Sequence, residues 1–219
     1  MLLESAACRI PASNSSGVSQ LLKMVASHLS SSGYYKLGTL YVQKQNYACA
    51  AAAFQNPLNL DGTSWQARYS LGLSLAEEGK YSQASVELRK VVAQKSEFAK
   101  AHHALGSVLQ SMGNRNGAAA EFERAIRLDP KLYYAYYDLA QALDSQKEYT
   151  AEIYYLRKAL ALNPPKRTAS SLEMQLGTAY EHGKKKGSAI RALRKAVALS
   201  PKSVQTHYDL ATMYARNFR

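Results

Sequence analysis

The sequence predicts an all-α fold, an α-solenoid in which one helix-turn-helix unit repeats along the chain. Three observations support this prediction. A Leu-Gly or Leu-Ala pair recurs at a nearly fixed period, Ala and a bulky apolar residue follow it at fixed distances, and Gly and Pro number only 12 and 6 among 219 residues. Low Gly and Pro content favours helices, and a period of about 20–50 residues is typical of solenoids and related arrays.

The first half of each unit predicts an amphipathic helix. The recurring pairs lie 34 residues apart, except for one interval of 37. We count positions from the Leu of each pair, so that the small residue after it is at +1. An aromatic residue or Leu at +4 falls on the same helix face as the Leu. The Leu positions are Leu37, Leu71, Leu105, Leu139, Leu176 and Leu210, and the +4 residues are Tyr41, Leu75, Leu109, Leu143, Tyr180 and Tyr214.

The second half of each unit predicts another helix, packed closely on the first. Gly or Ala at +1 and Ala at +13 are small enough for the two helices to approach, and Phe or Leu at +17 fills the gap. Proline ends three of the second helices, because it cannot continue a helix. The +13 residues are Ala50, Ala84, Ala118, Glu152 and Ala189, with Glu152 as the exception; the +17 residues are Phe54, Leu88, Phe122, Leu156 and Leu193; the prolines are Pro130, Pro164 and Pro201.

This pattern resembles the tetratricopeptide repeat (TPR) family, whose units read aromatic-x₂-Leu-Gly-x₂-Tyr, then Ala-x₃-Phe, then Pro. The resemblance covers residues 31–219, as about five repeats plus a terminal half repeat. It implies a right-handed solenoid in which the first helix of each repeat lines a concave inner surface. Ligand peptides of the family usually lie on that surface.

Three segments are expected. Residues 1–16 form a flexible tail, residues 17–30 a flanking or capping helix, and residues 31–219 the repeat array. Pro57 lies within the second helix of the first repeat and should shorten it. The three extra residues around Pro165 should lengthen one turn between repeats.

The sixth repeat stops at Arg219, after its first helix. Leu210, Met213 and Tyr214 would then have no following helix to cover them, and helical arrays usually need a polar cap. Three arrangements remain open. The natural chain continues, the end packs on another copy, or the last helix serves as the cap.

The inner surface is predicted from the positions two before and two after each Leu. Tyrosine dominates the first set and hydroxyl residues the second, which suits a peptide or helix of mixed apolar and polar character. The alternative is that these rings only pack against the neighbouring repeat. The predicted groove residues are Tyr35, Thr39, Tyr69, His103, Ser107, Tyr137, Gln141, Met174, Thr178, Tyr208 and Thr212.

Two devices that some family members use are missing from these positions. The carboxylate clamp of Lys, Asn and Arg has no counterpart among the Tyr, Thr, Gln and Ser side chains expected there. An asparagine ladder is also missing. The positions one before each Leu are Lys36, Ser70, Ala104, Asp138, Gln175 and Asp209.

The net charge of +12 gathers in the C-terminal half, where residues 131–219 hold 15 Lys or Arg against 7 Asp or Glu. Cations near helix C-termini complement the helix dipole, and solubility with stability is the favoured interpretation. The alternative is a basic outer patch for nucleic acid or an anionic membrane. Its candidate residues are Lys184, Lys185, Lys186, Arg191, Arg194 and Lys195.

No catalytic, metal-binding or cofactor-binding motif is found in the sequence. Cys49 is expected to be a buried thiol rather than half of a disulfide, and His102 and His207 to be packing residues. No cofactor is expected, and no stretch is long and apolar enough to span a membrane. No signal peptide is evident, so the cytoplasm is the default location.

The sequence therefore predicts a protein-binding scaffold rather than an enzyme, with self-association through the C-terminal end as a further option. The alternatives are the regulatory or targeting part of a larger enzyme or secretion machine, and nucleic-acid binding through a basic convex face.

Overall fold

The computed structural model describes Cys8 and residues 30–60 and 62–217. Helices and short turns account for nearly all of this part of the chain, and no strand occurs in it. Apart from Cys8, the predicted tail lies outside the described residues, and so does the predicted flanking helix except for Ser30.

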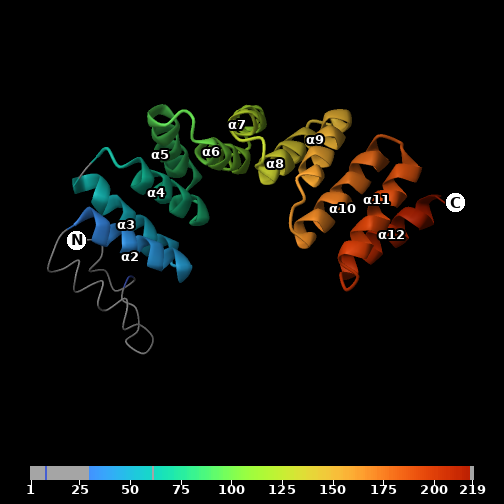
Figure 1. The fold of residues 1–219 in the computed structure, drawn as a ribbon, viewed down its shortest axis with the longest axis horizontal. Helices are drawn as coiled ribbons and strands as arrows, with labels where there is room; N and C mark the ends of the chain where they lie inside the picture. Colours follow the sequence, from blue (N-terminus) through green and yellow to red (C-terminus); the bar gives the residue numbers. More distant parts are fainter. Residues whose placement is uncertain (1–7, 9–29, 61, 218–219) are drawn as a thin grey trace. The chain divides into compact units, whose positions relative to one another are not determined.

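The repeats alternate two kinds of helix (Figure 1). The first helices of the repeats are α2 (Ser31–Gln43), α4 (Trp65–Glu77), α6 (Ala99–Ser111), α8 (Tyr133–Asp144), α10 (Lys166–His182) and α12 (Val204–Asn217). The second helices are α3 (Tyr47–Leu60), α5 (Tyr81–Gln94), α7 (Arg115–Leu128), α9 (Tyr149–Ala161) and α11 (Lys186–Leu199).

The chain divides into two compact units, Met1–Gly113 and Asn114–Arg219. In the first unit each helix from α2 to α6 packs against the next one along the chain, and in the second unit the same holds from α7 to α12 (Figure 1). Neighbours in sequence are thus neighbours in space within each unit, as expected for stacked helix pairs.

The repeat register coincides with the core. The Leu of each full repeat and the +17 residue are at most 5% exposed, and Ala at +13 is fully buried wherever it occurs. This confirms the assignment of these positions to the helix interface. The exposed fractions of the five Leu side chains are 0% for Leu37, 4% for Leu71, 1% for Leu105, 0% for Leu139 and 5% for Leu176.

Small residues at +1 are required by the distance between the paired helices. A Cβ on Gly177 would lie 2.7 Å from Leu193 Cγ, and a Cβ on Gly72 would lie 2.8 Å from Leu88 Cγ. Both values are well below van der Waals contact, so the +17 side chain occupies the space that a larger +1 residue would need.

The turn inside each full repeat contains one residue in the left-handed region, always at +8. These residues are Gln45, Gly79, Gly113, Lys147 and Lys184, with φ between 56° and 79°. Only two are glycine, which adopts this conformation without steric cost. This constraint could not be predicted from the sequence, because Gln and Lys also occupy the position.

Pro57 does not shorten its helix. It lies inside α3, which runs for 14 residues, as α5, α7 and α11 do. The prediction was wrong because Pro57 stands in the last third of the helix, where it removes one hydrogen bond to the residue four earlier. Its ring is fully buried.

The three extra residues near Pro165 do not lengthen a turn either. The connection before α10 covers residues 162–165, the same length as residues 95–98 before α6. The insertion instead extends α10 to 17 residues. Pro165 caps this helix in an extended conformation and its carbonyl accepts from Ala169 N at 2.9 Å, because proline favours the start of a helix over its interior.

Cys49 is not a free thiol. It forms a disulfide with Cys8, and the two Cα atoms lie 5.5 Å apart. Tyr41 supports this arrangement, because its buried hydroxyl donates to the Cys8 carbonyl at 3.0 Å. A separation of 41 residues matches no recognisable disulfide pattern, so the pairing could not be inferred from spacing.

The apolar side chains of α12 are more buried than expected. Met213 is 4% exposed and packs against Ala189 and Leu193 of α11. Leu210 and Tyr214 are half-buried, and Arg216 fastens α12 to α10 through an ion pair of 2.9 Å with Glu181. The exposed apolar side chains of α12 are instead Val204 and Tyr208, at 83% and 66%.

Two glycines of the last complete repeat test the packing constraint. We expect Gly177→Ala to lower the free energy of unfolding by about 1–3 kcal/mol, because the added methyl group overlaps Leu193. Gly187→Ala is the matched control. Nothing lies within 4 Å of a Cβ there, and alanine in α11 should stabilise the protein by about 0.5–1 kcal/mol. Urea unfolding followed by circular dichroism measures both; equal effects would contradict the packing assignment.

Candidate functional site

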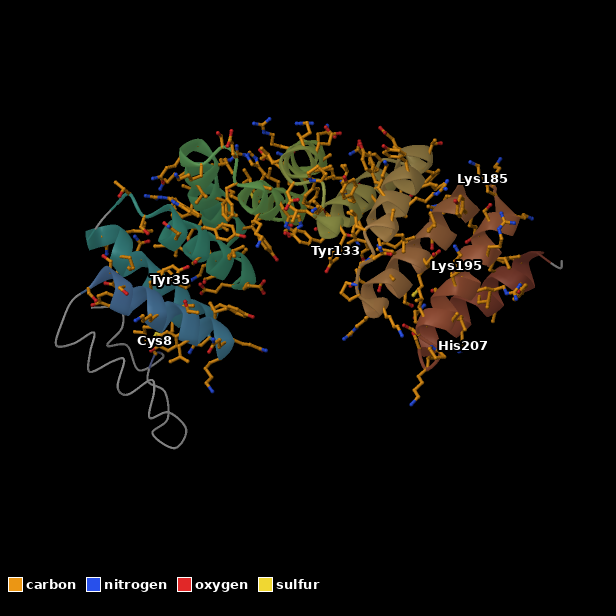
Figure 2. All side chains as sticks on the ribbon, in the orientation of Figure 1. Cys8, Tyr35, Tyr133, Lys185, Lys195 and His207 are labelled. Atoms are coloured by element: carbon orange, nitrogen blue, oxygen red, sulfur yellow. A yellow bond between two sulfur atoms is a disulfide. The ribbon has the colours of Figure 1, made fainter. Side chains whose placement is uncertain are left out.

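The first unit carries its predicted groove residues on α2, α4 and α6. Tyr35 is 37% exposed, its ring lies 5.4 Å from that of Phe54, and its hydroxyl is 3.4 Å from Ser70 Oγ (Figure 2). Thr39 is exposed one turn later and donates to the Tyr35 carbonyl at 3.0 Å. Tyr35 therefore both packs on its own repeat and presents part of its ring to solvent.

A pocket of about 350 Å³ lies beside Tyr35, between α2 and α4. Two further apolar side chains on its walls are partly exposed, Val42 at 39% and Leu73 at 38%. An exposed carboxylate, Glu77, lines it too, and no cation pairs with this group among the described residues. The complete lining is Tyr35, Thr39, Val42, Tyr47, Phe54, Ser70, Leu73, Ser74 and Glu77.

The other predicted groove residues of this unit are half-buried. The Tyr69 ring packs edge to face on Phe98, with centroids 5.0 Å apart. Ser107 donates to the His103 carbonyl at 3.1 Å, within its own helix. These three side chains do not line the pocket, and Tyr69 stabilises the turn before α6.

In the second unit, Tyr137 links two successive first helices. Gln175 Nε2 donates to its hydroxyl at 3.2 Å, and Gln141 also bonds to it. Burial and the nearby Asp138 raise the pKa of Tyr137, and the bond from Gln141 opposes that rise. Tyr137 and Gln141, both predicted, thus form one polar cluster with Gln175.

The remaining predicted residues of this unit differ in exposure. Met174 and Thr212 are half-buried, whereas Thr178 is exposed and bonds to the Met174 carbonyl at 3.4 Å. Tyr208 is 66% exposed. It has the largest free aromatic surface among the predicted groove residues.

One hydrogen bond between successive first helices occurs in both units and was not predicted from the sequence. The tyrosine two before a Leu bonds to the residue one before the next Leu, as in Tyr35 with Ser70 and Tyr137 with Gln175. From the sequence, the position one before each Leu served only to exclude an asparagine ladder. The equivalent partner of Tyr69 is Ala104, whose methyl group offers no hydrogen bond.

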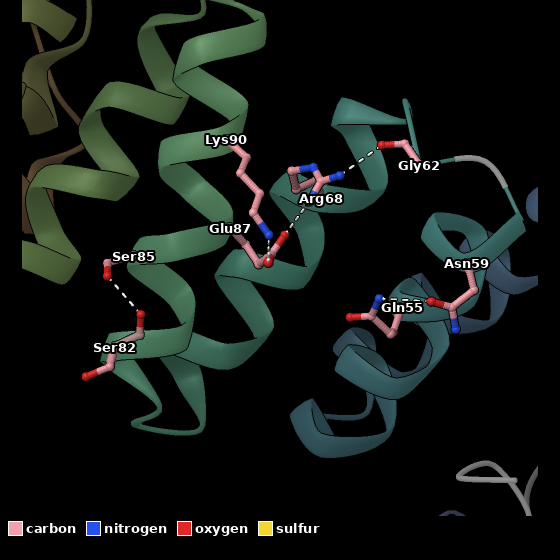
Figure 3. A network of polar contacts seen from close by, with 8 residues as sticks. All are labelled: Gln55, Asn59, Gly62, Arg68, Ser82, Ser85, Glu87 and Lys90. Carbon is pink, nitrogen blue, oxygen red and sulfur yellow. Dashed lines mark hydrogen bonds and ion pairs between the residues drawn. The ribbon is translucent and has the colours of Figure 1, made fainter.

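In three repeats the residue three before the Leu has a shared structural role. His102 Nε2 lies 3.0 Å from the Ser96 carbonyl, and His207 Nε2 lies 2.9 Å from the Pro201 carbonyl. In each case the ring nitrogen lies within hydrogen-bond distance of a carbonyl six residues earlier, in the turn before the helix. In the second repeat the same position is Arg68, which donates to Gly62 O and also binds Glu87 at 2.7 Å (Figure 3).

The predicted basic residues lie in the turn before α11 and along that helix, where Figure 2 labels Lys185 and Lys195. All six are exposed. Lys195 approaches Glu173 at 3.6 Å, and Arg191 donates to Ser188 at 3.0 Å. Lys184 and Lys185 lie in the turn between α10 and α11, directly after the C-terminal end of α10, and Lys186 begins α11.

Two carboxylates of the second unit are buried. Glu152 is 4% exposed and Glu173 is 6% exposed, and each keeps one oxygen without a hydrogen-bond partner. Burial, with a smaller contribution from Asp144, raises the pKa of Glu152 to about 7. Burial also raises the pKa of Glu173, although Lys195 opposes the shift.

Within the described part of the chain, no three His, Cys, Asp or Glu side chains are grouped so that they could hold a metal ion. The same residues include no helix with the length and apolar character needed to cross a membrane.

Comparison with known sequences identifies the fold family. Family models described as tetratricopeptide repeat match residues 35–97, 103–166 and 174–203. The chain belongs to the tetratricopeptide repeat family. The predicted fold class, an all-α right-handed solenoid of TPR helix pairs, is thereby confirmed. No curated protein sequence matches the chain.

Solved TPR structures are similar to most of this TPR chain. A MamA crystal structure has a TM-score of 0.70 at 24% identity, over 80% of this chain and 94% of that one. YrrB has a TM-score of 0.70 at 17% identity, over 88% and 98%. MamA from Desulfovibrio magneticus RS-1 has a TM-score of 0.72 at 20% identity, over 80% and 97%. These likenesses concern the fold, and the TPR repeats support a protein-interaction scaffold.

Glu152 makes the stability of this TPR array depend on pH. Its pKa is about 7 in the folded chain and near the ordinary 4.5 when unfolded, so the folded state holds the proton more tightly. Stability should therefore fall as pH rises from about 4.5 to about 7 and stay low above that range. We expect Glu152→Ala, which restores the residue of the other repeats, to raise the free energy of unfolding by about 1–2 kcal/mol more at pH 8 than at pH 4.

Urea unfolding of both proteins across this pH range measures the effect. Glu97→Ala, at an exposed glutamate in a turn, serves as the control. A pH profile for Glu152→Ala that parallels the wild-type profile would rule out Glu152 as the titrating group.

Proposed function

We propose that the chain is a non-enzymatic scaffold that binds a protein partner, as an extended peptide or a helix, on the faces of its first helices. The observation that supports this most directly is the pocket between α2 and α4, because the predicted groove residues Tyr35 and Thr39 line it. The proposal applies to the equivalent faces of the second unit as well, where Tyr208 is exposed.

The chemistry of the pocket suits one class of ligand. Tyr35, Val42 and Leu73 offer apolar surface that folding has left exposed to water. A ligand side chain that covers them gains about 25 cal/mol for each Å² of apolar area removed from water. Rings such as Tyr35 lose little conformational entropy on binding, because they have few rotatable bonds.

Glu77 adds a charge preference. Its carboxylate is exposed and has no cation partner among the described residues. A peptide with an apolar side chain followed closely by Lys or Arg would fill the pocket and pair with this carboxylate. An exposed ion pair contributes only about 0–1 kcal/mol, so Glu77 should set the orientation and selectivity of the ligand more than its affinity.

Two further points favour this function. YrrB, a structural relative, is described as a TPR protein with an unusual peptide-binding site. Moreover, the sequence contains no catalytic motif, and the hydroxyl groups of Thr39 and Ser107 bond to backbone carbonyls of their own helices, as structural hydroxyls do.

A phage-displayed library of random peptides tests the proposal without a known partner. Selection on the full chain should enrich sequences that combine a large apolar residue with a nearby Lys or Arg. The double variant Tyr35→Ala, Leu73→Ser should weaken binding of these peptides at least about tenfold, because it removes most of the exposed apolar wall.

The matched control is Met112→Ser, which removes an apolar side chain that is 46% exposed and lies outside this pocket. It should leave binding unchanged, and circular dichroism should show equal helicity for all three proteins. Enriched peptides that bind the double variant as well as the wild type would refute a ligand site at this pocket. Failure to enrich any sequence would do the same.

A further inference from the structure

We propose that the outer surface of α9 and α11 is a docking surface for single-stranded nucleic acid, separate from the pocket between α2 and α4. The surface, called here the outer basic face, consists of Tyr154, Arg157, Lys158, Arg191, Arg194 and Lys195, with Lys184, Lys185 and Lys186 at its edge.

The repeat register places these side chains together. Tyr154, Arg157 and Lys158 stand at +15, +18 and +19 of the fourth repeat. Arg191, Arg194 and Lys195 occupy the same three positions of the fifth repeat. All six are exposed, and α9 and α11 both pack against α10, so equivalent positions point outward from two neighbouring repeats.

Acidic residues do not balance this charge. Within α9 and α11 the one acidic residue, Glu152, is buried. Two carboxylates lie nearby: exposed Glu148 at the N-cap of α9 lines a pocket with Tyr154, and Glu173 lies 3.6 Å from Lys195. Arg157, Lys158 and Arg194 have no acidic partner among the described residues. The same register in the first unit differs, because Glu87 on α5 binds Lys90 at 2.7 Å and also Arg68 (Figure 3).

The arrangement does not stabilise the helix. Arg191 has like charges three and four residues later on one face of α11, a spacing that destabilises a helix. Lys186 adds positive charge at the N-terminal end of α11, which the dipole of that helix disfavours, whereas Lys184 and Lys185 also follow the C-terminal end of α10, whose dipole favours cations. A polyanion bound across this face would relieve both repulsions.

Tyr154 favours a single-stranded nucleic acid over the other polyanions that could bind these cations. Its side chain is 55% exposed, and Lys158 Nζ lies 5.4 Å from the centre of its ring. Aromatic rings between cations are the shared feature of surfaces for single strands, because unpaired bases stack on the rings while phosphates meet the cations. An anionic membrane would also attract these cations, but firm docking of a helix surface on a membrane usually adds exposed aliphatic residues or Trp that insert. The outer basic face has no such side chain.

Fluorescence anisotropy of a labelled thymidine oligonucleotide of about 20 nucleotides, mixed with the full chain between about 50 and 200 mM salt, tests the proposal. Contact of the five cations of the outer basic face with phosphates predicts a slope of about −3.5 for log K against log salt, at about 0.7 per contact for single strands. The double variant Arg157→Gln, Lys158→Gln should lower the affinity and make the slope shallower by about 1.4. A second double variant, Arg191→Gln, Arg194→Gln, should have the same effect. Tyr154→Ala should lower affinity about fivefold or more with little change in slope.

The matched control is Arg89→Gln, Lys90→Gln, at the +18 and +19 positions of α5. It removes the same formal charge, so an equal loss of affinity would reduce the effect to net charge and overturn the proposal. The proposal would also be overturned if a duplex of equal length, phosphatidylserine vesicles or poly-glutamate competed better than the unlabelled single strand. The absence of binding at the lowest salt would overturn it too.

Discussion

The close approach of the two helices in each repeat is the constraint on which the rest of the structure depends. Gly at +1 of the first helix leaves room for Leu at +17 of the second, as Gly177 does for Leu193. This contact fixes the rotation of both helices about their axes. Once the buried side is fixed, positions two before and two after each Leu lie along one face, and positions +15, +18 and +19 lie on another.

The two faces carry different side chains. On the first helices, Tyr35 and Tyr137 bond to the next first helix within their units, yet Tyr35 still presents ring surface beside a pocket. Packing and ligand contact are not exclusive for Tyr35, because its ring packs on Phe54 and is still 37% exposed. On the second helices the positions +18 and +19 contribute nothing to the core. Their side chains are therefore free to vary in charge from one repeat to the next.

The sequence was sufficient for the fold because each buried position recurs in several repeats. It was insufficient for features that occur once. The disulfide of Cys8 with Cys49 joins residues with no diagnostic spacing. Pro57 and the insertion at Pro165 were misjudged because a proline near a helix end is tolerated there, and helix length adjusts before turn length does. The pocket also depends on Val42 and Glu77, which lie outside the register positions used to predict the groove.

The central claim is that the register separates two binding faces, and chemical-shift mapping on one ¹⁵N-labelled sample tests it directly. A peptide selected on the chain should perturb amides of α2 and α4, around Thr39 and Leu73. A thymidine oligonucleotide should perturb amides of α9 and α11, around Lys158 and Arg194. Each ligand should leave the other set unchanged when both are present. Overlapping sets, or displacement of one ligand by the other, would contradict the account.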